Sequence, residues 1–570
     1  MDARKRRARK ELASGVLRAA FAVGKLELQN GQLLESIVTI AKRRAPVFAR
    51  DFTFAELLEW SATQYGERTC LEYGQDRYSF AELNRASNRV ARALKKAGVG
   101  TGVGVALMLS NHPRFLTGFF AVQKLGAYAV PVNTGLVGEG LAYILDHSES
   151  QFALVDHETA DKLSGVREKL PRLRSVWVND AEADAGYTLP AKMLPFSELE
   201  HASEYDALNI GERPHDDTPS LLLYTSGTTG LPKAVVSQYG NQRVKPIGLL
   251  ANLLFTPDDK IYTCLPLFHA NALILSVMQG LWAGIPLYLS KRFSASKFWQ
   301  EVASCGATQL NTVGSMIPIL LKTPPGLYDR AHRVRRIVSA ACPKDAWEPF
   351  EQRFGVVLWE GYGAVDGGGV TIFNMGDAPI GSIGRPAKVV TWRLAKEDGS
   401  SADVGEAGEL RVFVGDKKQS HVPYWRNEKA ANEKVKDGWL HTGDIMQRDV
   451  AGYLYFVGRN TDSMRRRGEN VSAYEIEKVV DSHPDVLESA AFGVPSPLGE
   501  QDIMVSIVPV EGRHIDAAEL HAYLVSRLPK YAVPSYLDVV DTLPKTGTHR
   551  VIKARLKERG VSAQTIQLGA

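Results

Sequence analysis

The ten residues from 224 to 233, YTSGTTGLPK, combine glycines, hydroxyl side chains and a cation in one short stretch. The small residues from Ser226 to Gly230 allow successive backbone N–H groups to face inward and form a concave anion site. The hydroxyl groups add donors, and Lys233 adds a positive charge. Phosphate is therefore the predicted occupant, and the whole ten-residue string disfavours a plain surface turn.

This stretch differs from the standard P-loop. That motif needs G-x-x-x-x-G-K-[ST] leading into a helix, whereas Lys233 follows Pro232 and stands three residues after the second glycine. Pro232 also favours an extended conformation at Leu231. The apolar run SLLLY comes directly before the stretch. We therefore expect a loop at the end of a strand, where open α/β sheets bind their ligands.

Short apolar runs alternate with helical patterns on the N-terminal side of this loop. VGVALML (103–109), YAVPV (128–132) and FALVD (152–156) have the length and composition of buried strands, and PRFLTGFFAVQKLG has that of a helix. The alternation predicts an α/β fold with doubly wound, mostly parallel sheets. After about residue 460 the shorter strands and helices predict a small α+β domain. The expected divisions are an extension at 1–50, a large domain at 51–460 and a small domain at 461–570.

The composition excludes several classes of protein. The four cysteines among 570 residues have no paired spacing, so neither a disulfide framework nor a zinc site is predicted and a reducing compartment fits best. The net charge is +4, but residues 1–10 hold six basic side chains against one Asp, which leaves −1 for the rest. No nucleic-acid-binding face is therefore expected.

Two segments raise the question of a membrane. The basic residues 1–10 predict a solvated terminus, with a tether to anionic lipid as the alternative because an amphipathic pattern follows them. The sequence thus predicts a cytoplasmic location, or peripheral attachment to the inner face of the membrane. Residues 272–290 are uncharged and long enough to cross a bilayer. Gln279, Gly284 and Pro286 instead predict a buried helix followed by a strand.

The decapeptide resembles the phosphate-binding signature of the acyl-adenylate-forming enzymes, which include acyl-CoA synthetases, peptide-synthetase adenylation domains and luciferases. The resemblance extends from about residue 50 to 560. Further stretches follow in the family's order: PLFH (266–269), SAACP (339–343), EGYGAVD (360–366), HTGD (441–444) and YFVGR (455–459). FSASKFWQEVASCGAT (293–308) and RGENVSAYEIE (467–477) are most similar to fatty acid transport proteins, very-long-chain acyl-CoA synthetases and carnitine-type CoA ligases.

The resemblance implies a role for each matching residue. His269 would gate the carboxylate, Tyr362 would pack on adenine, and Asp444, assisted by Arg459, would bind the ribose hydroxyls. The full nucleotide set is Thr225, Ser226, Gly227, Thr228, Thr229, Gly230, Lys233, Ser339, Ala340, Ala341, Glu360, Gly361, Tyr362, Gly363, Asp444, Phe456 and Arg459. The segment expected to bind CoA is Arg467, Gly468, Glu469 and Asn470, and the expected hinge is Thr461 and Asp462. The expected metal ligand is Asp366. The residues expected to act in catalysis are Arg550, His269, Thr228 and Lys233.

The same resemblance implies the reaction and its cofactors. ATP with Mg²⁺ would convert a carboxylate, which is a poor electrophile, into a mixed anhydride with AMP. CoA would then attack that anhydride after the small domain has swung about its hinge. The subgroup similarity implies a hydrophobic acid, either a long-chain fatty acid or a similarly lipophilic one. The identity of the acid and the oligomeric state stay open.

Three positions depart from the family pattern. Arg550 stands where the family has its adenylation lysine, and a planar guanidinium is not equivalent to an ammonium group. Lys553, at the place of a second, non-catalytic lysine, or Lys545 could substitute. Val365 removes a hydroxyl donor, and Asp366 is one methylene shorter than the usual glutamate as a magnesium ligand. These changes bear more on the rate of adenylation than on nucleotide binding.

Two other functions therefore remain open beside a CoA ligase. The protein could form the adenylate and pass the acyl group to a carrier protein or to another acceptor. Alternatively, it could be a nucleotide- or acyl-binding protein that has lost its chemistry, which Val365, Asp366 and Arg550 together would explain.

Overall fold

The computed structural model describes residues 52–569 with short gaps at 184–185, 202–212, 226–230, 315, 341, 368–370, 377, 388–389, 397, 416–421, 460–462, 498, 545–550 and 552. The predicted N-terminal extension lies outside the described residues. So do the following candidate site residues: Ser226, Gly227, Thr228, Thr229, Gly230, Ala341, Thr461, Asp462 and Arg550.

A seven-stranded sheet carries the base of the predicted phosphate loop. Its order is β7-β6-β5-β3-β4-β8-β9, and only the β8–β9 pair is antiparallel. The strands are β3 (Gly104–Met108), β4 (Tyr128–Pro131), β5 (Ser150–Asp156), β6 (Ser175–Asn179), β7 (Leu194–Pro195), β8 (Pro219–Thr225) and β9 (Lys233–Gln238). The three strands expected from apolar runs are thus confirmed, and they pair in parallel as predicted.

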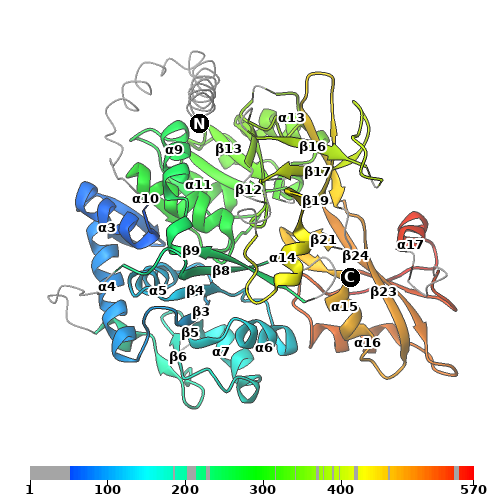
Figure 1. Ribbon diagram of the computed structural model, residues 1–570, viewed down its shortest axis with the longest axis horizontal. Helices are drawn as coiled ribbons and strands as arrows, with labels where there is room; N and C mark the ends of the chain where they lie inside the picture. Colours follow the sequence, from blue (N-terminus) through cyan, green and yellow to red (C-terminus); the bar gives the residue numbers. More distant parts are fainter. Residues whose placement is uncertain are drawn as a thin grey trace.

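An eight-stranded sheet lies beside the first and has the order β15-β14-β13-β12-β10-β11-β1-β2 (Figure 1). Its central pairs are parallel, and its two edge pairs are antiparallel. The strands are β1 (Thr69–Tyr73), β2 (Asp76–Ser79), β10 (Ile261–Thr263), β11 (Leu287–Leu289), β12 (Gln309–Val313), β13 (Arg336–Ala340), β14 (Val357–Gly363) and β15 (Thr371–Asn374). One continuous apolar core joins the two sheets.

Helices fill the space between and around these sheets. α5 (Pro113–Lys124), predicted from its apolar pattern, is buried along its whole length, and Pro113 begins it at the position where its missing N–H costs nothing. The others in the large domain are α3 (Phe54–Tyr65), α4 (Phe80–Lys96), α6 (Gly138–His147), α7 (His157–Ser164), α8 (Ser197–Glu200), α9 (Val244–Leu254), α11 (Phe298–Cys305), α12 (Met316–Lys322) and α13 (Lys344–Phe354).

The uncharged stretch at 272–290 forms a buried helix and a strand, as predicted. A π-helix, η3 (Asn271–Met278), continues into α10 (Gln279–Ala283), and Gly284 ends it in the left-handed conformation before β11 begins. The helix runs through Gln279 without a break, so only the glycine and proline that follow divide the stretch. In the part of the chain that the structure describes, no helix could span a membrane.

A third sheet and the small domain complete the molecule. The third sheet contains β16 (Trp392–Ala395), β17 (Gly408–Phe413), β18 (Val435–Lys436), β19 (Trp439–Arg448) and β20 (Leu454–Arg459), with α14 (Glu428–Lys434) beside it. The small domain contains the hairpin β21 (Ser463–Arg466)–β22 (Glu469–Ser472), the sheet β23 (Val486–Pro495), β24 (Gln501–Pro509), β25 (Tyr536–Val539) and β26 (Ile566–Gln567), and helices α15 (Ala473–Val480), α16 (Ala517–Val525) and α17 (Lys553–Arg559). It packs against one side of the large domain (Figure 1).

Close packing between α9 and α10 depends on a glycine. An ideal Cβ on Gly248 would lie 2.2 Å from two ring atoms of Trp282, which is buried. Gly140 in α6 is a helix-interior glycine without this constraint, because a Cβ there would meet only Leu136 Cδ2 at 3.8 Å.

We expect Gly248→Ala to lower the free energy of unfolding by about 1–3 kcal/mol, because the indole ring cannot retreat without disturbing the core. Gly140→Ala is the matched control, and it should be neutral or stabilise the protein by up to about 1 kcal/mol through its higher helix propensity. Urea unfolding followed by circular dichroism measures both. Equal effects of the two substitutions would contradict the close packing of α9 on α10.

Candidate active site

The predicted phosphate loop closes a hairpin. β8 and β9 are antiparallel, and their register pairs Thr225 with Lys233. The Thr225 hydroxyl donates to the Lys233 carbonyl at 3.3 Å. The loop therefore joins two strands of one sheet and does not lead into a helix, which agrees with the way its sequence departs from the P-loop.

Aromatic residues of α6 support the base of this loop. The Tyr143 hydroxyl donates to the Pro232 carbonyl at 3.2 Å, and its ring stacks on His147 with centroids 5.1 Å apart. His147 Nδ1 lies 2.8 Å from the Tyr224 hydroxyl. Burial, reinforced by the charge of Arg426, lowers the pKa of His147, so the ring is neutral at pH 7.

Residues 423–426 run along β9 and bring a further aromatic side chain to the site. Val236 N–H donates to the Pro423 carbonyl at 2.8 Å, and Trp425 N–H donates to the Ala234 carbonyl at 2.9 Å. Tyr424 lies between these two hydrogen bonds and forms an isolated antiparallel β-bridge with Val235.

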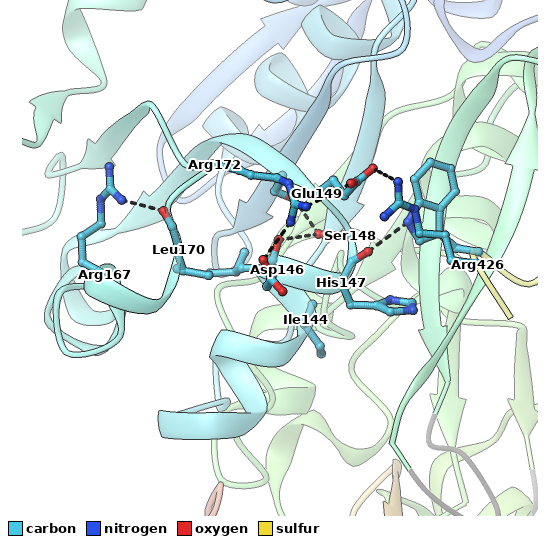
Figure 2. A network of polar contacts seen from close by, with 12 residues as sticks. Ile144, Asp146, His147, Ser148, Glu149, Arg167, Leu170, Arg172 and Arg426 are labelled. Atoms are coloured by element: carbon cyan, nitrogen blue, oxygen red, sulfur yellow. Dashed lines mark hydrogen bonds and ion pairs between the residues drawn. The ribbon is translucent and has the colours of Figure 1, made fainter.

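A polar network at the end of α6 fixes this segment. Figure 2 shows Arg426 pointing toward Glu149, with which it forms an ion pair at 2.6 Å. Arg172 contacts Asp146 at 3.0 Å and Glu149 at 3.7 Å. Trp425 Nε1 donates to the His147 carbonyl at 3.0 Å. The two residues after Tyr424 are therefore tied to the end of the helix that supports the loop, and Pro423 before it is tied to β9.

Tyr424 and Lys434 contact the predicted metal ligand, and Lys233 lies beside Tyr424. The Tyr424 hydroxyl donates to Asp366 Oδ2 at 2.6 Å, and Lys434 Nζ lies 3.0 Å from the same oxygen. Lys434 also donates to the Thr442 carbonyl at 3.2 Å, and Lys233 Nζ lies 5.7 Å from the centre of the Tyr424 ring. Burial and the Asp366 charge raise the pKa of Tyr424, so it remains a neutral donor.

Sequence reasoning identified Lys233 and Asp366 but missed Tyr424 and Lys434. Both missed residues lie between the family motifs, in a stretch of ordinary polarity around 423–434. Only the pairing of that stretch with β9 and the position of α14 bring them to Asp366. No pattern in the sequence indicates this. Val365, the neighbouring departure, is 41% exposed.

On the nucleotide side, the structure brings Tyr362 and Asp444 together. The Tyr362 hydroxyl, on β14, donates to Asp444 Oδ2 on β19 at 2.6 Å. Asp444 is buried and pairs in register with Arg459 of β20. Phe456 is 44% exposed and pairs with Met446 in the same β19–β20 ladder.

The predicted adenine-side residues lie at the ends of β13 and β14. Ser339 and Glu360 are neighbours in the parallel register, with Ala340, Gly361 and Gly363 following along the two strands. The buried Glu360 carboxylate accepts a hydrogen bond from Cys342 N–H at 3.1 Å. Glu360 thus holds the backbone of the adenine-side loop.

On the carboxylate side, a hairpin of the small domain meets the large domain. His269 Nε2 lies 3.0 Å from both carboxylate oxygens of Glu469 on β22. A Cβ on Gly468 would come within 3.1 Å of Val313 Cγ2 at the end of β12. Arg467 and Asn470 flank these contacts. The structure therefore brings the predicted CoA-binding segment to the predicted carboxylate gate.

The other end of the small domain points away from this gate. Lys553 Nζ forms an ion pair with Glu477 Oε1 of α15 at 2.8 Å. α17, which Lys553 begins, lies on the side of the small domain far from the large domain (Figure 1). In this arrangement Lys553 does not take the place expected of the adenylation cation.

Comparison with known proteins agrees with this geometry. Residues 58–413 match the family described as AMP-binding enzyme, and residues 475–550 match the AMP-binding enzyme C-terminal domain. The crotonobetaine/carnitine–CoA ligase of Escherichia coli O157:H7 (strain EC4115 / EHEC) is 30% identical over 511 residues, which cover 87% of this chain and 97% of that enzyme.

Solved structures share the fold along nearly their whole length. A double mutant of o-succinylbenzoate CoA synthetase (MenE) from Bacillus subtilis, bound with its product analogue OSB-NCoA, superposes with a TM-score of 0.73 at 26% identity, covering 88% of this chain and 98% of that one. The amide bond synthetase McbA from Marinactinospora thermotolerans gives a TM-score of 0.75 at 21% identity, covering 89% and 99%. The family match spans most of the large domain, and the chain therefore belongs to the AMP-binding enzymes as an acyl-CoA ligase of the acyl-adenylate-forming superfamily.

Proposed function

We propose that this protein joins CoA to a hydrophobic carboxylic acid, a long-chain fatty acid or a similarly lipophilic one, through an acyl-adenylate. The contact between Glu469 and His269 carries the proposal, because it brings the segment expected to bind CoA to the residue expected to gate the carboxylate. Apolar walls behind that gate, from α9, η3 and β13, support a hydrophobic acid.

In the first step a carboxylate oxygen attacks the α-phosphorus of ATP, and the bond to pyrophosphate breaks. This chemistry depends on positioning and on stabilising negative charge. Lys233 and Lys434 are the cations that the described residues offer near the loop, and Tyr424 orients Asp366. Tyr362 and Asp444 would hold the adenosine.

Asp366 fits a magnesium ion that arrives with the nucleotide. Within the described residues no group of three His, Cys, Asp or Glu could hold a metal by itself. Mg²⁺ beside substrate phosphates needs only one or two protein carboxylates, with water completing its shell. When bound, the ion would neutralise phosphate charge. Asp366 must share its carboxylate with Lys434, so ammonium and metal compete for the same oxygen.

In the second step the CoA sulfur attacks the acyl carbonyl, the C–S bond forms, the C–O bond to AMP breaks, and the thiol proton leaves. The arrangement with Glu469 on His269 suits this step. We propose that adenylation uses another arrangement, reached by rotation about residues 461–462, in which the segment before α17 faces the large domain. The position of α17 on the far side supports such a rotation.

The proposal is tested by incubating the purified protein with ATP, Mg²⁺, CoA and acids of short to very long, aromatic and polycyclic types. AMP and acyl-CoA are then measured by mass spectrometry, and joint appearance of both would support the ligase. Acyl-AMP without thioester would redirect the search to a carrier protein or another acceptor. Absence of both with every acid would contradict the proposal and favour a binding protein.

We expect substitutions at the two ends of the small domain to affect different steps. Glu469→Gln should slow transfer of a preformed acyl group from AMP to CoA by roughly 10- to 100-fold, since a charged hydrogen bond is worth roughly 1.5–3 kcal/mol, and leave adenylation nearly unchanged. Arg550→Lys should instead raise adenylation, by up to about 10²-fold, and leave transfer unchanged. Single-turnover assays of each step measure both, with the exposed Glu511→Gln as control. A slower adenylation in Glu469→Gln would contradict the assignment.

We expect Lys434→Met to lower the Mg²⁺ concentration that gives half-maximal activity. The partly buried ion pair is worth about 1 kcal/mol, which corresponds to a several-fold change. Asp366→Asn should raise that concentration. Lys436→Met, on the adjacent exposed position, is the matched control. Titration of Mg²⁺ at saturating ATP measures the half-maximal concentration for each variant. A lower rate of Lys434→Met at saturating Mg²⁺ would contradict competition with the metal and show that Lys434 acts on the phosphates themselves.

A further inference from the structure

A pocket lies between elements that are adjacent in sequence or in the sheet to His269, the expected carboxylate gate, and to the predicted nucleotide-binding residues. Its apolar walls are Leu250, Leu254, Phe255, Leu275, Val338 and Phe373. η3 begins two residues after His269, and β13 passes from Val338 directly to Ser339. Phe373 pairs in register with Gly361, whose Cβ would lie 3.0 Å from the Phe373 ring. The pocket therefore lies where the body of an activated acid would extend.

Three side-chain amides also line this pocket, and the donor nitrogens of two of them have hydrogen-bond partners. Gln309 Nε2 donates to the Leu254 carbonyl at 2.7 Å. Asn311 Nδ2 donates to Asn271 Oδ1 at 3.0 Å and to Ser276 Oγ at 3.3 Å. Gln279 differs, because it is 1% exposed and its Nε2 has no hydrogen-bond partner among the described residues.

An unpartnered amide donor at this depth is unfavourable. Leaving a buried polar group without a hydrogen bond destabilises a protein by about 1–3 kcal/mol. Most neighbours of Gln279 along the helix are apolar, and leucine or methionine would fill the same space without this cost. The amide therefore points to a partner that enters through the pocket.

The helix also sets the place of this partner relative to the carboxylate. Gln279 follows His269 by ten residues, and the helix that begins at Asn271 carries Gln279 near its other end. At about 1.5 Å per residue the two lie at most about 15 Å apart along the axis. Nε2 is a donor, so the partner must be an acceptor. A carboxylate is excluded, since an isolated charge among apolar walls is strongly unfavourable.

We propose that the acid carries a neutral oxygen group, a ketone or a hydroxyl, in the part of its hydrophobic body far from the carboxylate, and that Gln279 binds this group. This inference rests on the proposed function and narrows its substrate class to oxygenated lipophilic acids. Gln279 then acts as a specificity-determining residue. The remaining walls of the pocket are mostly apolar, which suits a hydrocarbon body.

The test compares matched acids on the wild type and on Gln279→Met, which keeps an unbranched side chain and removes the amide. The acids are straight-chain acids of medium to very long length with and without a ketone at the far end, and a polycyclic acid with and without a ring ketone. The wild type should prefer the keto acid by about 10²-fold or more in kcat/KM, because a site built for a hydrogen bond rejects the analogue that lacks it. Gln279→Met should lose this preference.

Two controls keep the inference falsifiable. Leu275→Met changes an apolar wall of the same pocket and should keep the preference. Gln279→Met should fold with a melting temperature equal to or above that of the wild type, since it removes an unsatisfied donor. A keto preference that is absent in the wild type, or unchanged in Gln279→Met, would overturn the inference; either result would mean that water satisfies the amide.

A binding measurement separates this inference from the proposed function. Calorimetric titration of the wild type with each keto acid and its plain counterpart, without ATP or CoA, reports recognition alone. Tighter binding of the keto acids without any thioester product would uphold the pocket and reject the ligase. Thioester formation with equal binding and equal kcat/KM for both acids would uphold the ligase and reject the role of Gln279.

Discussion

The charged end of the site depends on the carboxylate of Asp366. Lys434 and Tyr424 both bind its Oδ2 atom, and Lys233 lies over the Tyr424 ring. Two ammonium groups in one partly buried region repel each other unless a negative charge lies between them. Asp366 supplies a negative charge to Lys434 in this region. The network at the end of α6 in turn fixes Tyr424, so a surface ion pair such as Arg426–Glu149 bears on the geometry at Asp366 (Figure 2).

The three departures from the family pattern gain a physical context from this arrangement. A shorter acidic side chain at 366 reaches less far toward a metal, yet Lys434 brings a positive charge to the same oxygen. An internal ammonium can stabilise phosphate charge that a weakly held metal would leave uncompensated. Val365 is partly exposed, so loss of a hydroxyl there leaves no buried gap. These observations favour retained chemistry over a protein that only binds nucleotides.

Sequence reasoning predicted the parts of the fold and site that depend on local pattern. The strands at 103–109, 128–132 and 152–156 are apolar runs of the right length, and the β8–β9 loop has a recognisable composition. Contacts between segments far apart in the sequence could not be predicted. Glu469 meets His269 across 200 positions of sequence, and Lys434 reaches Asp366 only because α14 ends beside β19. Such contacts follow from packing, which no local pattern encodes.

Gln279 illustrates the same limit and joins the two ends of the site. From sequence it appeared as one of the residues that interrupt an apolar stretch, whereas the helix continues through it as η3 gives way to α10. π-helical turns are rare and are frequently found at functional sites. Here His269, the residue that we expect to gate the carboxylate, lies just before the helix, and a buried amide lies near the end of the same helix. Because Trp282 of the same helix packs against Gly248 of α9, any shift of this helix would move the gate, the amide and one pocket wall together. The packing of α9 on α10 therefore links the position of the buried amide to that of the residue expected to gate the carboxylate.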